Sequence, residues 1–109
     1  MPNIFSKIPE KLRKELFEDI AQGGAFKLER IVSKGHAMPK GEWYDQDKDE
    51  WLILLKGKAG IVIDGKKEAI TLEPGDYLSL PAHQKHRVEW TDADSETVWL
   101  ALHYEPGVH

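Results

Sequence analysis

Two side chains with acid–base chemistry, Glu50 and His86, stand at informative places in this sequence. Glu50 opens the run E-W-L-I-L-L-K-G, in which Glu50, Leu52 and Leu54 share one face of a β-strand. If the two leucines fill an interior, Glu50 points inward as well, and a buried carboxylate must be paired, hydrogen-bonded, protonated or metal-bound. The alternative is an exposed glutamate among the charged residues Asp45, Asp47, Lys48 and Asp49.

His86 lies in a second run, G-D-Y-L-S-L-P-A-H-Q-K-H-R-V, which turns at Gly75, breaks at Pro81 and re-enters a strand at His86. An imidazole can bind a metal or exchange protons near neutral pH. The spacing of the two runs predicts that Glu50 and His86 meet inside one small β-barrel.

The composition limits the classes of protein that fit. The 109 residues suffice for one domain, and 40% hydrophobic with 31% charged residues is ordinary for a soluble globular protein. Fifteen scattered basic residues against 19 acidic ones argue against a nucleic-acid partner. The absence of cysteine excludes disulfides and thiolate metal sites and fits a reducing cytosol, so we expect a cytoplasmic protein. We expect no signal peptide and no membrane partner.

The first 25 residues are predicted to form an N-terminal helical segment. Apolar residues recur on one helical face over about residues 9–22, at Leu12, Leu16, Phe17 and Ile20, and Gly23 with Gly24 provides a stop. Because a lone short helix is marginal in water, we expect its apolar face to cover the sheet or a second subunit. A homodimer through this helix or the first strand is therefore expected.

Residues 26–109 are predicted to form an all-β domain, an antiparallel β-barrel or jelly roll. Short β-rich runs follow one another without a helix, with Asp64-Gly65 predicting a type I′ hairpin and Pro74-Gly75 a type II turn. Such a barrel hides its edges and can hold one small ligand. The seven predicted strands are 26–32, 51–56, 59–64, 67–72, 77–80, 87–90 and 97–104.

The order of the motif residues resembles a known family. The first segment has six residues between Glu50 and Gly57, and the second has five residues between Gly75 and Pro81, with His86 five positions beyond the proline. With 17 residues between the segments, this order resembles both signature motifs of the cupin family. The resemblance implies a small single-domain cupin barrel over about residues 33–90.

The resemblance also bears on a metal. In metal-binding cupins two histidines precede the glutamate and bind a divalent ion together with the second-motif histidine. The corresponding positions here are Trp43 and Asp45, or Tyr44 and Gln46 if the gap is one residue shorter. Asp45 can supply an oxygen ligand, whereas Trp43 cannot ligate and would wall the pocket.

A further departure from the family lies at His83, where the second motif has glycine. His83 either points to solvent from the turn or adds an imidazole near His86. In the second case the set Asp45, Glu50, His83 and His86 would suit Mn, Fe(II), Ni or Zn.

Other residues are candidates for the pocket itself. Trp43, Tyr44 and Gln46 lie in the long loop before Glu50, where amphipathic rings suit a ligand pocket or simply pack over the barrel mouth. His36 either braces this loop or enters the pocket. His103 lies in the last strand, where a satisfied core histidine is the default.

Three functions remain open at this point. The first is an enzyme of the oxygenase, isomerase or lyase type that acts on a small polar substrate, with a divalent metal held by His86, Glu50 and Asp45. The second is a metal-free domain that binds or senses a small molecule. The third is a structural dimer module whose barrel is filled by side chains.

Overall fold

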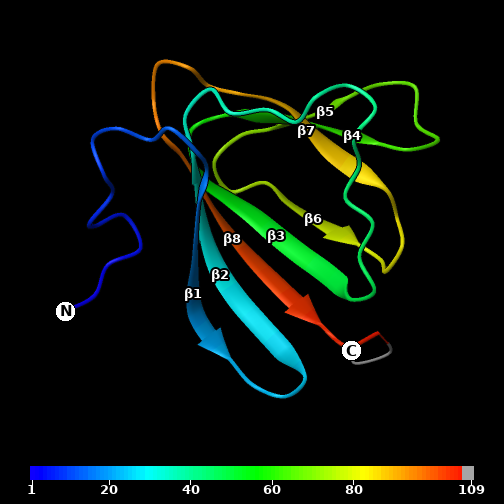
Figure 1. The fold of residues 1–109 in the computed structure, drawn as a ribbon, viewed down its shortest axis with the longest axis horizontal. Coiled ribbons are helices and arrows are strands. Elements are labelled where there is room, and N and C mark those ends of the chain that lie inside the picture. Colours follow the sequence, from blue (N-terminus) through cyan, green and yellow to red (C-terminus); the bar gives the residue numbers. More distant parts are fainter. Residues whose placement is uncertain (107–109) are drawn as a thin grey trace.

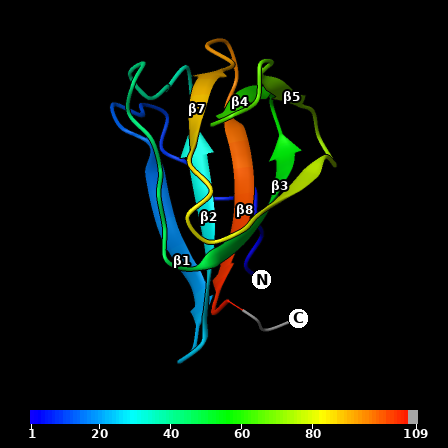
Figure 2. The same cartoon turned by 90° about the vertical axis from the view of Figure 1, so that its right-hand side faces the viewer.

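The computed structural model describes residues 1–106, and these residues form two facing antiparallel β-sheets (Figures 1 and 2). The larger sheet has the order β1-β2-β8-β3-β6 and the smaller one the order β5-β4-β7. The predicted all-β antiparallel barrel is therefore confirmed. The strands are β1 (Leu16–Gln22), β2 (Phe26–Ser33), β3 (Asp49–Lys56), β4 (Ala59–Ile63), β5 (Ile70–Leu72), β6 (Tyr77–Leu80), β7 (His86–Thr91) and β8 (Thr97–Tyr104).

The core lies between the two sheets and follows the period of two. Leu52 and Leu54 on β3 are buried, as is Ile61 on β4 of the opposite sheet. On β8 the inward residues Trp99 and Ala101 are also buried. This alternation turns every second residue of β3 and β8 toward the interior, which sets the side on which functional groups can lie.

The predicted N-terminal helix is wrong, because residues 16–22 form strand β1 instead. β1 pairs with β2 from Leu16 opposite Val32 to Gln22 opposite Lys27. Gly23 and Gly24, which the sequence suggested as a helix stop, form the turn of this hairpin, where the Gly23 amide donates to the carbonyl of Phe26. A short isolated helix is marginal in water, whereas the same residues satisfy their backbone groups along the edge of β2.

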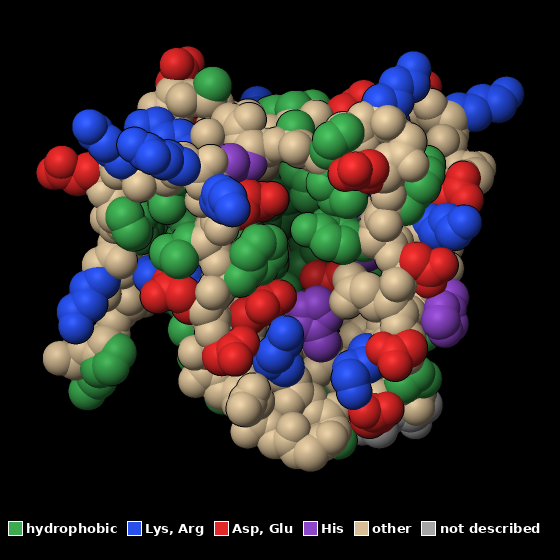
Figure 3. Space-filling model, viewed as in Figure 1, with side chains coloured by type: hydrophobic (Ala, Val, Ile, Leu, Met, Phe, Trp, Pro, Cys, Tyr) green, Lys and Arg blue, Asp and Glu red, His purple; other side chains and the backbone are tan. Residues whose placement is uncertain are grey.

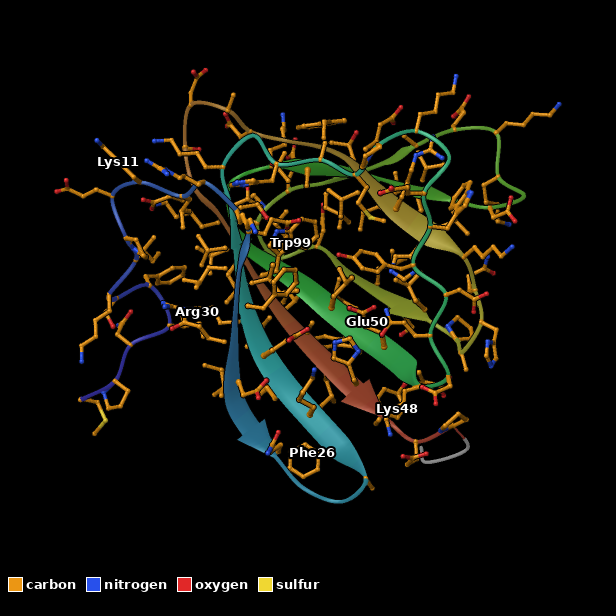
Figure 4. The ribbon with its side chains drawn as sticks, viewed as in Figure 1. Lys11, Phe26, Arg30, Lys48, Glu50 and Trp99 are labelled. Carbon is orange, nitrogen blue, oxygen red and sulfur yellow. The ribbon has the colours of Figure 1, made fainter. Side chains whose placement is uncertain are left out.

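The segment before β1 is fastened by Arg30 on β2. Its guanidinium donates to the carbonyl oxygens of Ile4 and Ser6, and it pairs with the Glu18 carboxylate on β1. The arginine is almost fully buried by these contacts. Figure 4 shows Arg30 beside the N-terminal segment, which lies next to the edge strand β1.

Two turns show how glycine fixes the strand connections. Gly57, between β3 and β4, has a φ of 90°, and a Cβ there would lie 2.4 Å from the Thr97 hydroxyl oxygen, so that only glycine fits. Gly75, with a φ of 96°, follows Pro74 in a turn closed by a bond from the Asp76 amide to the carbonyl of Glu73, which agrees with the predicted type II turn.

The predicted type I′ turn at Asp64-Gly65 is wrong. Only Gly65 has a positive φ, and the Lys66 amide donates to the carbonyl of Ile63, a pattern that fits a type II turn. The following strand begins at Ile70 rather than at residue 67, so the connection is longer than a two-residue hairpin. Within residues 1–106 there is no helix of the length and apolarity needed to cross a membrane.

Candidate functional site

A cavity of about 830 Å³ opens between the two sheets, and Figure 3 shows this face hollowed around green apolar side chains, with acidic and histidine side chains beside them. Its apolar wall comes from both sheets and includes Ile31 and Trp99 on the larger sheet and Ile61 and Val88 on the smaller one. Its polar residues concentrate at the ends of β2, β3, β7 and β8. The polar lining residues are Glu15, Gln22, Lys27, Glu29, Tyr44, Asp45, Gln46, Asp47, Lys48, Glu50, His83, His86 and His103.

Glu50 and His86 face each other across this cavity from opposite sheets. Glu50 lies at the start of β3 and His86 at the start of β7, with Glu50 Oε1 and His86 Nε2 separated by 3.5 Å. Both side chains are more than nine-tenths buried, at 7% and 5% exposure. Glu50 Oε1 also accepts a hydrogen bond from the Gln46 amide at 3.1 Å. Figure 4 shows Glu50 extending from β3 into the barrel interior.

The hydrogen bonds of His86 define which ring nitrogen is free. Nδ1 lies 3.1 Å from the carbonyl oxygen of Gln84, and because a carbonyl can only accept, Nδ1 carries the proton. In the neutral imidazole Nε2 therefore has an unshared lone pair directed at the Glu50 carboxylate. When His86 is neutral, two acceptor atoms therefore face each other in a buried place.

A second histidine–carboxylate pair, formed by His103 and Glu29, lies beside the first. His103 Nε2 is 2.9 Å from Glu29 Oε1 and 4.0 Å from Glu50 Oε2. The hydrogen bond to Glu29 raises the pKa of His103, and the same bond lowers the pKa of Glu29 despite the opposing effect of burial. His103 is therefore an ion-paired pocket residue rather than an ordinary core histidine.

The strand register explains why these groups meet. His103 on β8 stands directly opposite Lys27 on β2 and Glu50 on β3. Glu29 follows Lys27 by two residues on the same face of β2, and the Lys27 ammonium lies 3.7 Å from Glu29 Oε2. The register thus gathers two acidic and two basic side chains, those of Glu29, Glu50, Lys27 and His103, on three neighbouring strands at the floor of the cavity.

The loop before β3 decides which of its residues enter the pocket. The Tyr44 backbone pairs with that of His86 through two hydrogen bonds, and their rings lie 5.3 Å apart. Tyr44 and Gln46 line the cavity, and of the two readings of the gap these are the positions that face Glu50 and His86. Trp43 instead packs under the Arg87 guanidinium, 4.7 Å from its ring centre, and is absent from the cavity lining.

The pKa of the Tyr44 phenol reflects the charge inside the cavity. Burial raises the pKa of the Tyr44 phenol, and the carboxylates of Glu15, Glu50 and Glu29 raise it further. Nearby negative charge opposes ionisation of a phenol. The interior of the pocket is therefore negative around Tyr44.

Asp45 and His83 lie together at the rim of the cavity. Asp45 Oδ1 is 2.9 Å from His83 Nδ1, and the two side chains are 43% and 70% exposed. His83 has a φ of 63°, the left-handed conformation that the family's glycine adopts without cost. The four residues of the expected metal set thus form two separate pairs, one at the rim and one at the floor.

His36 does not line the cavity. Its Nδ1 accepts a hydrogen bond from the Lys34 amide, and its carbonyl accepts one from the Thr91 hydroxyl. The first bond closes the loop after β2 on itself, and the second fastens that loop to β7. The bracing role is the one that these contacts support.

Several cavity residues were missed in the sequence. Glu29 occupies an inward position of β2, and Phe17 reaches the cavity from β1, which was expected to be helical. The alternation of Lys27, Glu29 and Ile31 on one strand face was a signal for Glu29. Trp99 also lines the cavity, and its indole N–H has no hydrogen-bond partner among the described residues.

The residues fit a divalent metal only in part. Glu50 Oε1 and His86 Nε2, 3.5 Å apart, could bind the same ion, and the Gln46 side chain, whose amide nitrogen donates to Glu50, could turn its oxygen toward it. Within residues 1–106, no group of three or more histidine, cysteine or acidic side chains has the arrangement of a metal site. The protein thus offers two strong ligands where three or four are usual.

Comparisons with known proteins agree with this architecture. A structure from Ralstonia eutropha, named a putative mannose-6-phosphate isomerase, is 42% identical, with a TM-score of 0.93 over 96% of this chain and 97% of the other. A cupin superfamily protein from Desulfitobacterium hafniense is 21% identical with a TM-score of 0.73, over 90% of this chain and 84% of the other, and shows the same fold.

Curated relatives match at greater distance. The 3-hydroxyanthranilate 3,4-dioxygenases of Paraburkholderia phytofirmans and Burkholderia lata are 30% identical over 69 residues, 62% of this chain. The match spans only 40% of their own length. The family model described as "Cupin domain" matches residues 30–103, which include both motifs and the residues Glu50, His86 and His103. The chain therefore belongs to the cupin family.

Proposed function

We propose that this chain binds a small polar molecule in the barrel cavity and holds its polar part at Glu50 and His86. The observation that carries this proposal is the buried pair itself, with its two acceptor atoms 3.5 Å apart at the floor of an 830 Å³ cavity. A barrel that served only as a structural module would gain stability from apolar groups at these positions. A cavity of this volume is of the size that small ligands occupy.

The pair also supports acid–base chemistry on the bound molecule. Glu50 and the His86 Nε2 lone pair can each accept a proton from a substrate group placed between them. The similar proteins named as a dioxygenase and a putative isomerase are small-molecule enzymes, which is consistent with such a role. The reaction class proposed is therefore a conversion of a small polar substrate, of the isomerase, lyase or oxygenase type.

Binding of a divalent metal is the second candidate. It is favoured by the proton on His86 Nδ1, which leaves Nε2 free to ligate beside Glu50 Oε1. Gln46 would supply a third ligand, whereas Asp45 is engaged with His83 at the rim. A bound ion would supply Lewis-acid chemistry at the floor of the cavity.

Two measurements distinguish these functions. Protein purified without an affinity tag is analysed for metals beside the Glu50→Ala, His86→Ala double variant, and a library of small polar compounds is screened by nuclear magnetic resonance against both. Compounds that bind the wild type but not the double variant support the proposal. Stoichiometric metal lost in the double variant supports the second candidate, and the failure of every compound to bind would contradict ligand binding.

A further inference from the structure

Resting on the proposed function, we propose that the ligand of this pocket is a small organic cation, a primary ammonium attached to an apolar body. The inference combines three independent features of the cavity. These are the pair of facing acceptors, the neutralised lysines and the aromatic wall beside them.

The two facing acceptors can be satisfied by a ligand that supplies hydrogen-bond donors. Glu50 Oε1 receives one neutral hydrogen bond from Gln46, and its other near neighbour is the His86 Nε2 lone pair at 3.5 Å. No donor of the described residues stands between these two atoms. An ammonium carries three N–H donors and a positive charge, so that one group can bond to both acceptors and offset the buried carboxylate.

The charges around the cavity favour the same ligand. Five carboxylates line the cavity and its mouth, against two lysines. Lys27 is paired with Glu29, and Lys48 lies 2.5 Å from Glu105, so neither lysine has an ammonium free of a carboxylate partner. His103 in turn is held by Glu29. An anionic ligand would find no uncommitted cation, whereas a cation enters a field of favourable sign.

The walls fit an apolar body behind the ammonium. The Tyr44 ring lies 5.3 Å from the His86 ring, next to the acceptor pair, where an aromatic face also attracts a cation. Farther along the cavity the lining becomes apolar. The lining residues of this part are Phe17, Ile31, Leu52, Ile61, Val88 and Trp99.

The experiment compares probes of matched shape on the intact protein labelled with nitrogen-15. The probes are 2-phenylethylamine, 2-phenylethanol and 3-phenylpropionate, the shorter series butylamine, butanol and pentanoate, and trimethyl(2-phenylethyl)ammonium, which keeps the charge but has no N–H donor. Amide shifts of Tyr44, Glu50 and His86 report binding at the floor. Glu50→Gln removes the acceptor charge, and Glu73→Gln is a control at an exposed glutamate paired with Lys58 outside the cavity lining.

We expect the amines to bind at least about tenfold more tightly than the alcohols, and the carboxylates not to bind. Glu50→Gln should weaken amine binding by about tenfold or more, whereas Glu73→Gln should leave it within about twofold. The trimethylated cation should bind more weakly than the primary amine, because it cannot donate to the two acceptors.

The outcomes also separate this inference from the proposed function. Alcohols or carboxylates that bind at the floor as tightly as the amines would overturn the cation inference and leave ligand binding intact. A response of the same amides to Ni²⁺ with none to any amine would assign the pair to a metal ion and overturn it as well. If neither these probes nor the wider compound library perturbs the floor, both proposals fail.

Discussion

The molecule carries two histidine–carboxylate pairs from the same two sequence segments, and they differ in almost every physical respect. Glu50 and His86 are buried at the floor of the cavity, 3.5 Å apart, with acceptor facing acceptor. Asp45 and His83 are exposed at the rim, 2.9 Å apart. The rim pair has the shorter contact, yet solvent screens it and can replace either partner. A functional site is therefore better sought at two buried groups that do not hydrogen-bond to each other than at two well-paired groups in contact with water.

The neighbouring Glu29–His103 pair sharpens this contrast. It is only slightly more exposed than the Glu50–His86 pair but is matched, with a donor facing an acceptor at 2.9 Å. A buried polar group that is hydrogen-bonded to a matched partner indicates a stabilising role. A buried polar group without such a partner indicates a binding or catalytic site. The following predictions test this distinction.

The largest effect on stability is expected for His103→Ala. The substitution leaves the Glu29 carboxylate buried with only Lys27 nearby, and the loss of the free energy of unfolding should be about 2–3 kcal/mol. Urea denaturation followed by tryptophan fluorescence measures it. His36→Ala, at a histidine that braces a loop outside the cavity, should lose less than about 1 kcal/mol. A loss at His103 no larger than at His36 would refute the matched-pair role.

The Glu29–His103 pair should also make stability depend on pH. Since the pKa of His103 is raised from 6.5, its contribution is complete below that value and is lost as the pH rises through the folded pKa. Since the pKa of Glu29 is lowered from 4.5, its contribution is present above that value and is lost as the pH falls through the folded pKa. Both contributions to stability are therefore present between pH 4.5 and 6.5.

The free energy of unfolding from denaturation curves should therefore fall from pH 5.5 to pH 8.5, and the fall should be larger in the wild type than in His103→Gln. The glutamine can still donate to Glu29 but does not titrate. An equal difference in both proteins would show that other groups cause the pH dependence.

Glu50→Gln should stabilise the fold while it impairs binding. With the new amide nitrogen in the place of Oε1, one N–H can donate to His86 Nε2 and the other to the Gln46 amide oxygen once that side-chain amide turns over, so the facing acceptors become a hydrogen bond, and the gain should be about 1 kcal/mol. Such an exchange of function for stability is common at sites under functional constraint. Thermal and urea unfolding check the prediction, and a destabilised variant would mean that Glu50 is already well satisfied in the free protein.

The smallest effect is expected at the rim. His83→Gly removes a Cβ from a left-handed backbone at the cost of an exposed ion pair, and the net gain should be about 0.5 kcal/mol. Asp45→Asn, which breaks only the ion pair, should change stability by less than about 0.5 kcal/mol. Unfolding midpoints of the two variants measure this. A loss above about 1 kcal/mol in either variant would show that the rim pair matters energetically despite its exposure.

Much of the fold could be predicted because its signals are local. Alternating apolar residues predict strands, and Gly57 and Gly75 mark turns at which the backbone needs a positive φ. The prediction of a helix over residues 9–22 was wrong although its apolar residues, Leu12, Leu16, Phe17 and Ile20, fit a helical period. Residues 16–22 form a strand because they pair with the edge of β2, elsewhere in the chain. No local sequence pattern indicates that such an edge is available for pairing.

The site divides in the same way. The positions of Glu50 and His86 follow from strand alternation and from the order of the two motifs. The sequence does not decide whether Trp43 and Asp45 or Tyr44 and Gln46 turn inward. That choice depends on the backbone bridge between Tyr44 and His86, which joins segments 42 residues apart in the sequence. The contact between Glu29 and His103 likewise depends on β2 lying beside β8.

From the sequence alone came the barrel, its family and the two residues that face each other across its floor, since period, turn chemistry and motif order are written along the chain. The tertiary structure alone decided the partners of those residues. Register and sheet order place Gln46, Glu29 and His103 within reach, leave a cavity where side chains could have filled the barrel, and separate the rim pair from the floor pair. The physical reason is that side-chain partnership depends on distance in space, which no local pattern specifies.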